Sequence, residues 1–401
     1  MRVGVVGLGK LGLPLALCLA EEGFEVSGYD KDERLIRLLC GGNFFTHEPG
    51  VMDLLRNSQI KEKISFSDSP DNLCGCQIIY VIVPTPSNST SLFDSSFVEE
   101  AIREILHVSV ESSSKVSIVV VSTVMPGTCS NISQDIVGER PVKLIYSPEF
   151  IALGTVIQNL KYPDSILVGC ASYEDAKEHI EVQRRIAGDV PISILNWDEA
   201  EVAKLLVNCY VTMKISFANF VGEICDILPE ADPNKIAEAL GADSRIGRKY
   251  LNPGLGYSGP CFPRDNAALS AWSFMQGVKA DLALSTQAIN ERQPMIALNR
   301  ISKLLMKKSS VLIIGLVYKP RTEVLDKSQS LQLARELKQL GHSIFVFDPY
   351  ISEFDKGYLE SSFDFLSSLS KEHIFDLAIL SPGFEEYSKE LGSKQKMYKF
   401  S

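Results

Sequence analysis

The first thirty residues predict a strand, a tight glycine turn, a helix and a second strand. The apolar run at Val3 to Val6 leads into Gly7-Leu8-Gly9-Lys10-Leu11-Gly12. Helical periodicity from Leu11 to Glu22 is followed by another apolar run at Glu25 to Tyr29. Glycines at this spacing permit a tight turn, a close approach to pyrophosphate and close helix packing. This order of elements is the beginning of a doubly wound α/β sheet, and it constrains the fold more than any other feature.

Asp30 ends the second of these strands, and its type and place favour NAD as the cofactor. A carboxylate there accepts hydrogen bonds from the adenosine ribose hydroxyls and repels a 2′-phosphate, so NADP is disfavoured. A glycine turn kept only for packing is the weaker interpretation, because strand, turn, helix, strand and acid occur in register. The predicted NAD-binding residues of this segment are Gly7, Gly9, Lys10, Leu11, Gly12 and Asp30.

Further apolar runs continue this α/β pattern up to about residue 196. They lie at Gln77 to Val83, Ser117 to Val121 and Lys143 to Tyr146, and they alternate with helical patterns as parallel strands covered on both faces do. Polar loops follow two of these strands, at the strand ends where such sheets bind ligands. They add Thr85, Pro86, Ser122 and Thr123 to the candidate cofactor-binding residues. A capped strand end explains either loop equally well on local sequence alone.

The rest of the chain predicts a helical segment and a second α/β domain. A long, largely apolar helix from Glu201 to Asp226 precedes a shorter one near Lys235 to Leu240. Strand and helix patterns resume at Val311 to Gly315 without a second G-x-G-x-x-G, so this domain is expected to bind something other than the dinucleotide. A chain of 401 residues fits two or three domains, and we predict them at 1–196, 197–304 and 305–401.

Composition excludes several classes of function. The formal net charge is −10 and the basic residues are scattered, which argues against a nucleic-acid surface or a polybasic membrane anchor. Nine irregularly spaced cysteines favour reduced thiols in the cytoplasm, and the dispersed histidines support no metal site. We also expect no signal peptide and no segment apolar and long enough to span a bilayer.

A cysteine loop is the second feature that points to chemistry. Asn252 to Cys261 is dense in glycine and proline, so its backbone can approach a ligand and deliver Cys261 from a loop or a helix start. A helix N-terminus lowers the pKa of a thiol and makes it a better nucleophile. Asp265 follows one helical turn later and could position or deprotonate water. Lys204 and Asn208, four apart on the long helix, could hold an oxyanion or a water, although a solvated polar stripe is the simpler interpretation of that spacing.

Together these motifs resemble the nucleotide-sugar 6-dehydrogenases of the UDP-glucose/GDP-mannose dehydrogenase family, nearly from end to end. The resemblance rests on the glycine turn with Pro14, His47-Glu48-Pro49-Gly50, Pro84-Thr85-Pro86, Ser122 to Thr128, Ser147-Pro148-Glu149-Phe150, Lys204 with Asn208, the cysteine loop and Lys319-Pro320-Arg321-Thr322. It implies two Rossmann-like domains joined by a long helix that forms a homodimer or a higher oligomer. NAD is then expected on the first domain and the nucleotide of a UDP-sugar on the second.

The resemblance also implies a four-electron oxidation of a sugar C6 alcohol. A water near Lys204 and Asp265 takes the hydroxyl proton as the first hydride leaves. The Cys261 thiolate then adds to the aldehyde, a second hydride leaves, and water hydrolyses the thioester. The implied catalytic residues are Cys261, Lys204, Asp265, Asn208, Glu149 and Thr123. The implied substrate-binding residues are Glu149, Phe150, Ile151, Lys204, Asn208, Arg245, Tyr250, Leu251, Gly256 and Lys319.

Several positions depart from the family pattern. Arg264 replaces a lysine, Leu153 an acid and Ser165 an arginine, while Asp326 and Lys327 stand where an Arg-Glu pair is expected. UDP-glucose is the expected substrate, and a UDP-N-acetylhexosamine or another nucleotide hexose is the alternative. A catalytically impaired nucleotide-sugar-binding subunit and a two-electron hydroxy-acid dehydrogenase remain open, but neither requires Cys261, Lys204, Asn208 and Asp265 together.

Overall fold

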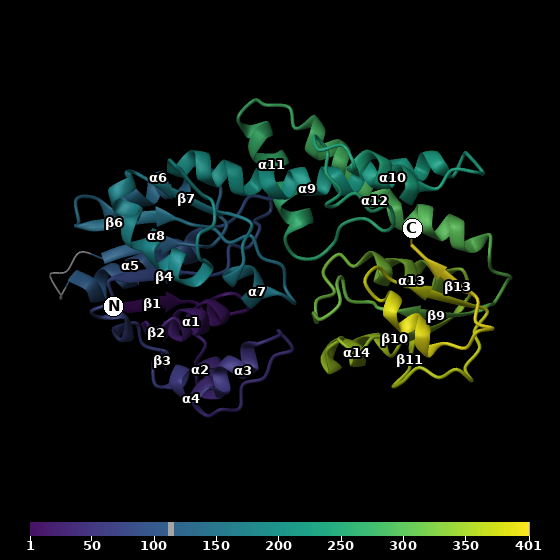
Figure 1. Ribbon diagram of the computed structural model, residues 1–401, viewed down its shortest axis with the longest axis horizontal. Helices are drawn as coiled ribbons and strands as arrows, with labels where there is room; N and C mark the ends of the chain where they lie inside the picture. The colour runs from purple at the N-terminus through teal and green to yellow at the C-terminus, as the bar shows by residue number, and fades with distance from the viewer. Residues whose placement is uncertain (111–115, 401) are drawn as a thin grey trace. The chain divides into compact units, whose positions relative to one another are not determined.

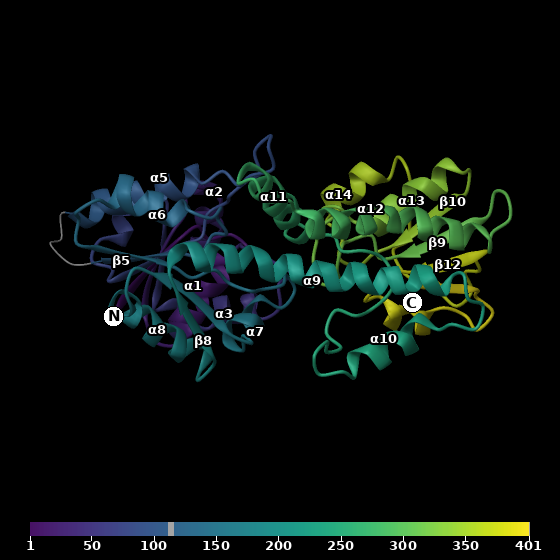
Figure 2. The ribbon, with the colours of Figure 1, turned by 90° about the horizontal axis from the view of Figure 1, so that it is seen from above.

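The computed structural model describes residues 1–110 and 116–400, which form two compact units. The first unit comprises Met1–Leu205, and the second begins at Leu206. Figures 1 and 2 show the elements of both units. The division into domains at 1–196, 197–304 and 305–401 stays a prediction.

The first unit alternates strands and helices. Its elements are β1 (Arg2–Val6), α1 (Gly12–Glu21), β2 (Glu25–Tyr29), α2 (Glu33–Cys40), α3 (Val51–Arg56), α4 (Ser58–Lys61), β3 (Ile64–Ser67), η1 (Pro70–Leu73), β4 (Ile78–Val81), α5 (Ser96–Val110), β5 (Val116–Val120), α6 (Thr128–Ile132), η2 (Ser133–Val137), β6 (Val142–Tyr146), α7 (Val156–Lys161), β7 (Ile166–Cys170), α8 (Tyr173–Ala187), β8 (Ile192–Leu195) and the start of α9 (Trp197–Cys225).

The second unit takes up the rest of α9 and continues with helices before its own sheet. Its further elements are α10 (Pro233–Gly241), α11 (Phe262–Met275), α12 (Asp281–Ser302), β9 (Ser310–Ile314), α13 (Gln329–Gln339), β10 (Ser343–Phe347), α14 (Glu353–Leu359), β11 (Asp364–Phe365), β12 (Leu377–Leu380), η3 (Glu385–Glu390) and β13 (Met397–Lys399).

The first sheet confirms the predicted doubly wound fold. Its eight strands have the order β3-β2-β1-β4-β5-β6-β7-β8, and all neighbours are parallel except β6 and β7. Alternate residues of β1 enter two different cores: Val3 and Val5 pack with the leucines of α1, whereas Val6 packs on the opposite face with the apolar side of α5. Burial on both faces explains why β1, β4 and β5 are continuous apolar runs. The strand order reverses between β1 and β4, because β2 and β3 lie on one side of β1 and β4 on the other, and ligands of such sheets bind at this switch point.

The second sheet repeats this arrangement on a smaller scale. Its five strands are all parallel, in the order β11-β10-β9-β12-β13. The predicted strands at Val311, Ser343 and Phe375 correspond to β9, β10 and β12. After β9 the chain turns at Gly315, whose φ is 91° and whose N–H donates to the Phe347 carbonyl (2.9 Å). The central strand of this sheet is therefore followed by a turn of the same type as the one after β1.

Helix α9 is one continuous element of 29 residues that begins in the first unit (Figure 2). The carboxylate of Glu201 is completely buried and accepts hydrogen bonds from the N–H groups of Gly127 (2.6 Å) and Cys129 (2.8 Å). It thereby satisfies two of the unpaired donors at the start of α6. These two bonds hold the first turns of α9 against the loop that follows β5.

The expectation that no segment is apolar and long enough to span a bilayer is wrong for α9. Its length and composition reach that limit. Its inward face nevertheless carries buried polar residues, among them Thr212, Ser216 and Asn219. The Ser216 hydroxyl donates to the Thr286 carbonyl of α12 (2.8 Å), as a core helix would require.

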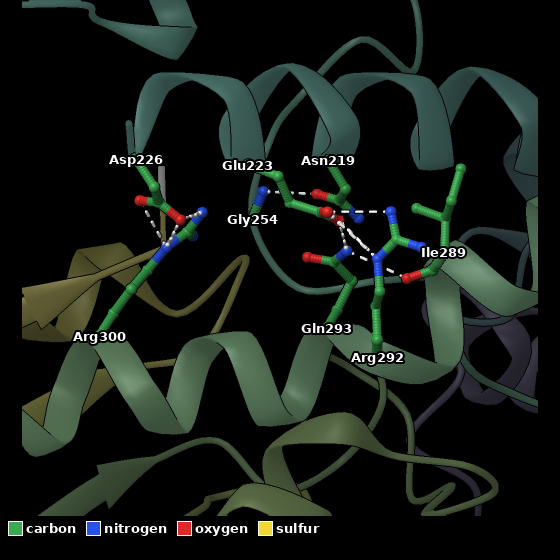
Figure 3. Close-up of polar contacts among 8 residues, drawn as sticks. All are labelled: Asn219, Glu223, Asp226, Gly254, Ile289, Arg292, Gln293 and Arg300. Carbon is green, nitrogen blue, oxygen red and sulfur yellow. Dashed lines mark hydrogen bonds and ion pairs between the residues drawn. The ribbon is translucent and has the colours of Figure 1, made fainter. Parts of the chain in front are cut away.

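Ion pairs join α9 to α12 within the second unit (Figure 3). Glu223 accepts from Arg292 at 2.9 Å and from Gln293 at 2.8 Å, while Asp226 accepts from Arg300 at 3.0 Å. The contacts of Arg292 and Gln293 lie on one turn of α12 and that of Arg300 about two turns later, so together they fix the register between these helices, because sliding either helix would break all of them.

Buried amides hold the cysteine loop in place. The N–H of Gly254 donates to Asn219 (2.8 Å) and that of Gly256 to Gln329 (2.6 Å), while Asn290 donates to the Tyr257 carbonyl (3.0 Å). A Cβ atom added to Gly256 would lie 1.9 Å from Asn290 Oδ1 and 2.7 Å from Gln329 Nε2. Glycine is required here because the amides approach the backbone too closely for any side chain.

Gly256→Ala is therefore expected to destabilise the second unit, whereas Gly357→Ala is not. The added methyl group must displace the Asn290 and Gln329 amides, and we expect a loss of roughly 2 to 4 kcal/mol. At Gly357, in α14, a Cβ meets no atom within 4 Å, and alanine should raise stability by about 0.5 kcal/mol. Urea denaturation followed by circular dichroism measures both changes. Equal stability of the two variants would contradict the proposed packing role of Gly256.

Candidate active site

The glycine turn between β1 and α1 has the shape that a pyrophosphate needs. Gly7 has φ 88°, and a Cβ there would lie 2.1 Å from the Ile82 carbonyl oxygen. A Cβ on Gly12 would lie 1.8 Å from the Gly7 carbonyl oxygen, so this glycine permits the helix to pack against the strand. The space above Gly9 is open. The three glycines therefore have the roles expected for dinucleotide binding: a turn, an open backbone and a close helix.

Asp30 lies beside this turn with a fixed carboxylate. One oxygen accepts from the Leu8 N–H (2.6 Å) and the other from the Asp32 N–H (2.9 Å). Lys10 is exposed, and Leu11 occupies the N-cap position of α1. Each carboxylate oxygen still has a lone pair for a ribose hydroxyl. The residues of the turn and Asp30 thus fit the adenosine and pyrophosphate parts of NAD.

The two polar loops after β4 and β5 are bonded to each other. The Ser122 hydroxyl donates to the Val83 carbonyl (2.7 Å) and accepts from the Val83 N–H (2.9 Å). The Thr85 hydroxyl donates to the Thr123 carbonyl (2.8 Å), and the side chain of Thr123 is half-buried. Pro86 is exposed. The hydroxyl groups of Ser122 and Thr85 thus donate hydrogen bonds that join the two strand ends. These bonds place Thr123 at a fixed position beside Thr85.

In the first unit, the Lys204 side chain contacts both Glu149 and Phe150. The Lys204 ammonium group donates to the Glu149 carbonyl and lies 4.3 Å from the centre of the Phe150 ring. A cation is attracted to an aromatic face at this distance. Ile151, the next residue, is half-buried and packs against the core. Lys204 is itself 6% exposed, so α9 delivers a nearly buried ammonium group to the end of β6.

The Glu149 carboxyl group titrates near neutrality. Burial raises its pKa to about 7, and Lys204 and a hydrogen bond from Gln183 oppose that rise. Gln183 lies on α8 and is 4% exposed. One turn earlier on α8, His179 is completely buried and shares a hydrogen bond of 3.2 Å with the Tyr80 hydroxyl. Gln183 and His179 could not be predicted from the sequence, because α8 is far from Glu149 along the chain and carries no motif.

The second unit brings Cys261, Asp265 and Asn208 together. Cys261 is exposed and occupies the N-cap position of α11, which confirms its predicted place at a loop or helix start. Its carbonyl accepts the Asp265 N–H (2.8 Å), so the two residues are one turn apart. The Asn208 amide donates to the Asp265 carboxylate (2.6 Å), which is almost completely buried. The Arg264 guanidinium group lies 3.4 Å from the same carboxylate.

The remaining candidate residues lie on the surface or in the loop packing. Arg245 is exposed and pairs with Asp243 (2.6 Å), while Tyr250 is exposed with φ 65°. Leu251 and Gly256 belong to the buried side of the cysteine loop. Lys319 is half-buried, and its carbonyl accepts the Thr322 hydroxyl (2.7 Å). Among the positions that depart from the family pattern, Leu153 packs against the first core and Ser165 is exposed.

Asp326 contacts the cysteine loop through its backbone. Its carbonyl accepts the N–H of Gly259 (2.9 Å), while its side chain and that of Lys327 are exposed. Gly259 has φ 84°, and a Cβ there would lie 2.6 Å from the Tyr318 ring. The segment with the altered charges thus supports the turn before Cys261 by a bond that does not depend on side-chain identity.

The predicted site residues therefore fall into two groups, one in each unit. The glycine turn, Asp30, the strand-end loops, Glu149 and Lys204 belong to the first. Asn208, Asp265, Cys261 and the loop glycines belong to the second. Lys204 and Asn208 lie one turn apart on α9, as their spacing predicted. In the stretches 1–110 and 116–400, no group of three potential metal-ligating side chains could hold an ion.

Comparison with known proteins identifies the family of each part of the chain. The UDP-glucose/GDP-mannose dehydrogenase family matches in three segments. Its NAD binding domain covers residues 1–187, its central domain residues 198–292 and its UDP binding domain residues 312–397. The first match agrees with the dinucleotide fit of the glycine turn and Asp30, and NAD is the cofactor.

Relatives and solved structures extend the match over the whole chain. UDP-glucose 6-dehydrogenase TuaD of Bacillus subtilis is 30% identical over 87% of this chain and 76% of its own length. A UDP-glucose dehydrogenase structure from Pyrobaculum islandicum is 27% identical, with a TM-score of 0.89 over 99% of this chain and 93% of that one. A UDP-D-ManNAc dehydrogenase structure from Pyrococcus horikoshii has a TM-score of 0.79 at 23% identity, over 100% and 95% of the two chains. The chain belongs to the UDP-glucose/GDP-mannose dehydrogenase family.

Proposed function

We propose that the protein oxidises the C6 alcohol of UDP-glucose to the carboxylate of UDP-glucuronate. The observation that carries this proposal is Cys261, an exposed thiol at the start of α11, followed one turn later by the Asp265 carboxylate that Asn208 holds. A single hydride transfer does not need a nucleophilic thiol, whereas a thiol that adds to the aldehyde forms a thiohemiacetal from which a second hydride can leave. Together with an NAD-binding unit, this arrangement supports a four-electron oxidation.

UDP-glucose is favoured over other nucleotide sugars by the relatives. TuaD and the Pyrobaculum islandicum protein are both described as UDP-glucose dehydrogenases, at 30% and 27% identity. A UDP-N-acetylhexosamine is the second candidate, because the chain also shares its fold with a UDP-D-ManNAc dehydrogenase. The two candidates differ at the sugar C2 substituent, so a panel of nucleotide sugars separates them.

The proposed reaction consumes two NAD⁺ and one water for each sugar. Bound NAD⁺ supplies the acceptor for each of two hydride ions that leave C6. A water held by Lys204 and Asp265 takes the hydroxyl proton in the first oxidation, and the Cys261 thiolate then forms a bond to the aldehyde carbon. Loss of the second hydride converts this thiohemiacetal to a thioester. Water then adds, the carbon–sulfur bond breaks and the thiolate is restored. One water oxygen enters the carboxylate and three protons are released.

Side chains of α9 and groups near Cys261 stabilise the negative charges that form in these steps. Lys204 and Asn208 donate to the oxyanions, because both carry donors on one face of α9. Asp265 positions the hydrolytic water, with Glu149 and Thr123 assisting. The helix N-terminus at Cys261 favours the thiolate. We propose that the nucleotide sugar is contacted by Phe150, Ile151, Arg245, Tyr250, Leu251, Gly256 and Lys319.

We also propose that the protein is a homodimer formed through α9. Exposed or half-exposed apolar residues repeat along this helix, and just beyond its end, in alternating steps of four and three: Leu206, Tyr210, Met213, Phe217, Phe220, Ile224 and Ile227. This heptad spacing forms one apolar seam on a helix, of the kind that pairs with a second helix. An apolar stripe of this length rarely faces water in a monomer. The reduced, cytoplasmic setting expected from the sequence stays a prediction; the nine cysteines, all within residues 1–110 and 116–400, form no disulfide.

The stoichiometry of NADH tests the proposed reaction. The protein is expected to form two NADH per UDP-glucose consumed, and Cys261→Ser to lose acid formation by roughly 10³-fold or more, because a hydroxyl is a poor nucleophile near neutral pH. Acid-quenched mass spectrometry should detect a sugar adduct on Cys261 in Asp265→Asn. Cys40→Ser, at another exposed thiol, serves as the matched control and should leave turnover unchanged. One NADH per sugar, or unchanged turnover in Cys261→Ser, would refute the mechanism.

The raised pKa of Glu149 predicts a pH-dependent stability. Between about pH 4.5 and pH 7, the folded state binds the Glu149 carboxyl proton more tightly than the unfolded state does. The stabilisation is therefore complete below about pH 4.5 and is lost as the pH rises through about 7. Urea denaturation should show that the protein loses roughly 2 kcal/mol more than Glu149→Gln between pH 5 and 8. Glu181→Gln, at an exposed position of α8, is the control. Parallel pH profiles for the protein and Glu149→Gln would contradict this assignment.

Charge on the α9 seam should break the dimer. In Phe217→Glu/Phe220→Glu, pairing would bury four carboxylates, so we expect a monomer by analytical ultracentrifugation at concentrations where the unaltered protein is a dimer. Phe274→Glu places the same charge at an exposed apolar residue of α11 that lies off the seam, and it should remain dimeric. A seam variant that stays dimeric would exclude α9 as the interface.

A further inference from the structure

A small cavity beside the glycine turn is bordered by an unusual set of charges. Its volume is about 130 Å³, and its lining includes Gly7, Asp30, Lys31, Glu100 and Glu104. It lies at the end of β2, where Asp30 is placed to meet the adenosine ribose. The residues around this cavity therefore decide which adenosine, with or without a 2′-phosphate, the unit accepts.

Lys31 is bound by two carboxylates from α5. Its ammonium group lies 2.9 Å from Glu100 and 3.1 Å from Glu104. The second oxygen of Glu104 accepts from the Tyr29 hydroxyl (3.1 Å), which fixes this side chain from the strand. Three carboxylates and one amine thus line the cavity, and the local charge is negative.

We propose that Glu100 and Glu104 determine the preference for NAD over NADP by keeping Lys31 from pairing with a 2′-phosphate. A lysine directly after Asp30 would otherwise supply a cation at this ribose and weaken the discrimination made by Asp30. Because Glu100 and Glu104 of α5 hold the Lys31 ammonium group, a 2′-phosphate would meet carboxylates and find no cation to pair with. Selectivity therefore depends on α5 as well as on the aspartate at the end of β2.

The electrostatics of neighbouring groups support this arrangement. Burial and then Glu104 raise the pKa of Tyr29 to about 12, while Lys31 opposes the rise. Burial lowers the pKa of Lys31, but its hydrogen bonds to Glu100 and Glu104 outweigh that effect and raise it. Exposed ion pairs are individually weak. Here, however, two acids act on one amine, and the Tyr29 hydrogen bond holds one of them in place.

This inference depends on the NAD-binding unit and not on the sugar, so it can be tested without turnover. Calorimetry at fixed ionic strength would compare adenosine 2′,5′-bisphosphate with 5′-AMP, and NADP⁺ with NAD⁺. In Glu100→Gln/Glu104→Gln we expect the two 2′-phosphorylated ligands to bind about 10-fold more tightly. Binding of 5′-AMP and NAD⁺ should change by less than about 3-fold, which also verifies that the variant is folded.

Three further variants make the test decisive. Glu100→Gln alone keeps the Tyr29–Glu104 bond and should give about a 3-fold gain. Glu62→Gln/Glu139→Gln removes the same charge from exposed positions that do not line the cavity and should give none. Adding Lys31→Ala to the double variant should abolish most of the gain. No gain in the double variant, or a gain that survives Lys31→Ala, would overturn the proposal.

Discussion

The buried carboxylate of Glu201 is the contact on which the arrangement of the first unit depends. A carboxylate without solvent costs several kcal/mol unless hydrogen bonds replace the lost water, and burial raises the pKa of this group. The N–H groups of Gly127 and Cys129 supply those bonds. They fix the beginning of α9 against the loop after β5. Because Lys204 follows one turn later on the same helix, the same two bonds determine where its ammonium group meets Glu149 and Phe150.

The second unit solves a related problem with neutral groups. The cysteine loop has no regular structure to satisfy its backbone, so Asn219, Asn290 and Gln329 bond it from α9, α12 and α13. Glycine at position 256 is the condition for these amides to approach. Side chains that take no part in any reaction step thus determine where α11 begins, and Cys261 stands at that point. A loop held this way can present a thiol to solvent without being loose.

The sequence was most informative where structure depends on neighbours along the chain. The strands β1, β2, β4, β9 and β10, the glycine turn, and the helix start at Cys261 all follow from local periodicity and turn residues. The contacts of Glu201, Gln183 and Gln329 could not be predicted, because each partner lies more than thirty residues away and amides or acids on helices usually face solvent. The polar residues on the inward face of α9 were not predicted either, because they are a minority among apolar residues in that stretch of sequence.

The turns after β1 and β9 explain how one type of sheet can bind two different ligands. After β1, Asp30 accepts a single N–H of the turn, and the backbone at Gly9 remains open. After β9, the half-buried Asp348 accepts the N–H groups of both Leu316 (2.7 Å) and Val317 (2.9 Å). A carboxylate therefore occupies the donors that a pyrophosphate would approach, and a valine side chain stands where the first turn has an open glycine. The second turn resembles the first in its backbone, but Asp348 and the Val317 side chain take the donors and the space that a pyrophosphate would use. This difference gives a physical reason why the missing glycines after β9 indicated a different ligand for the second sheet.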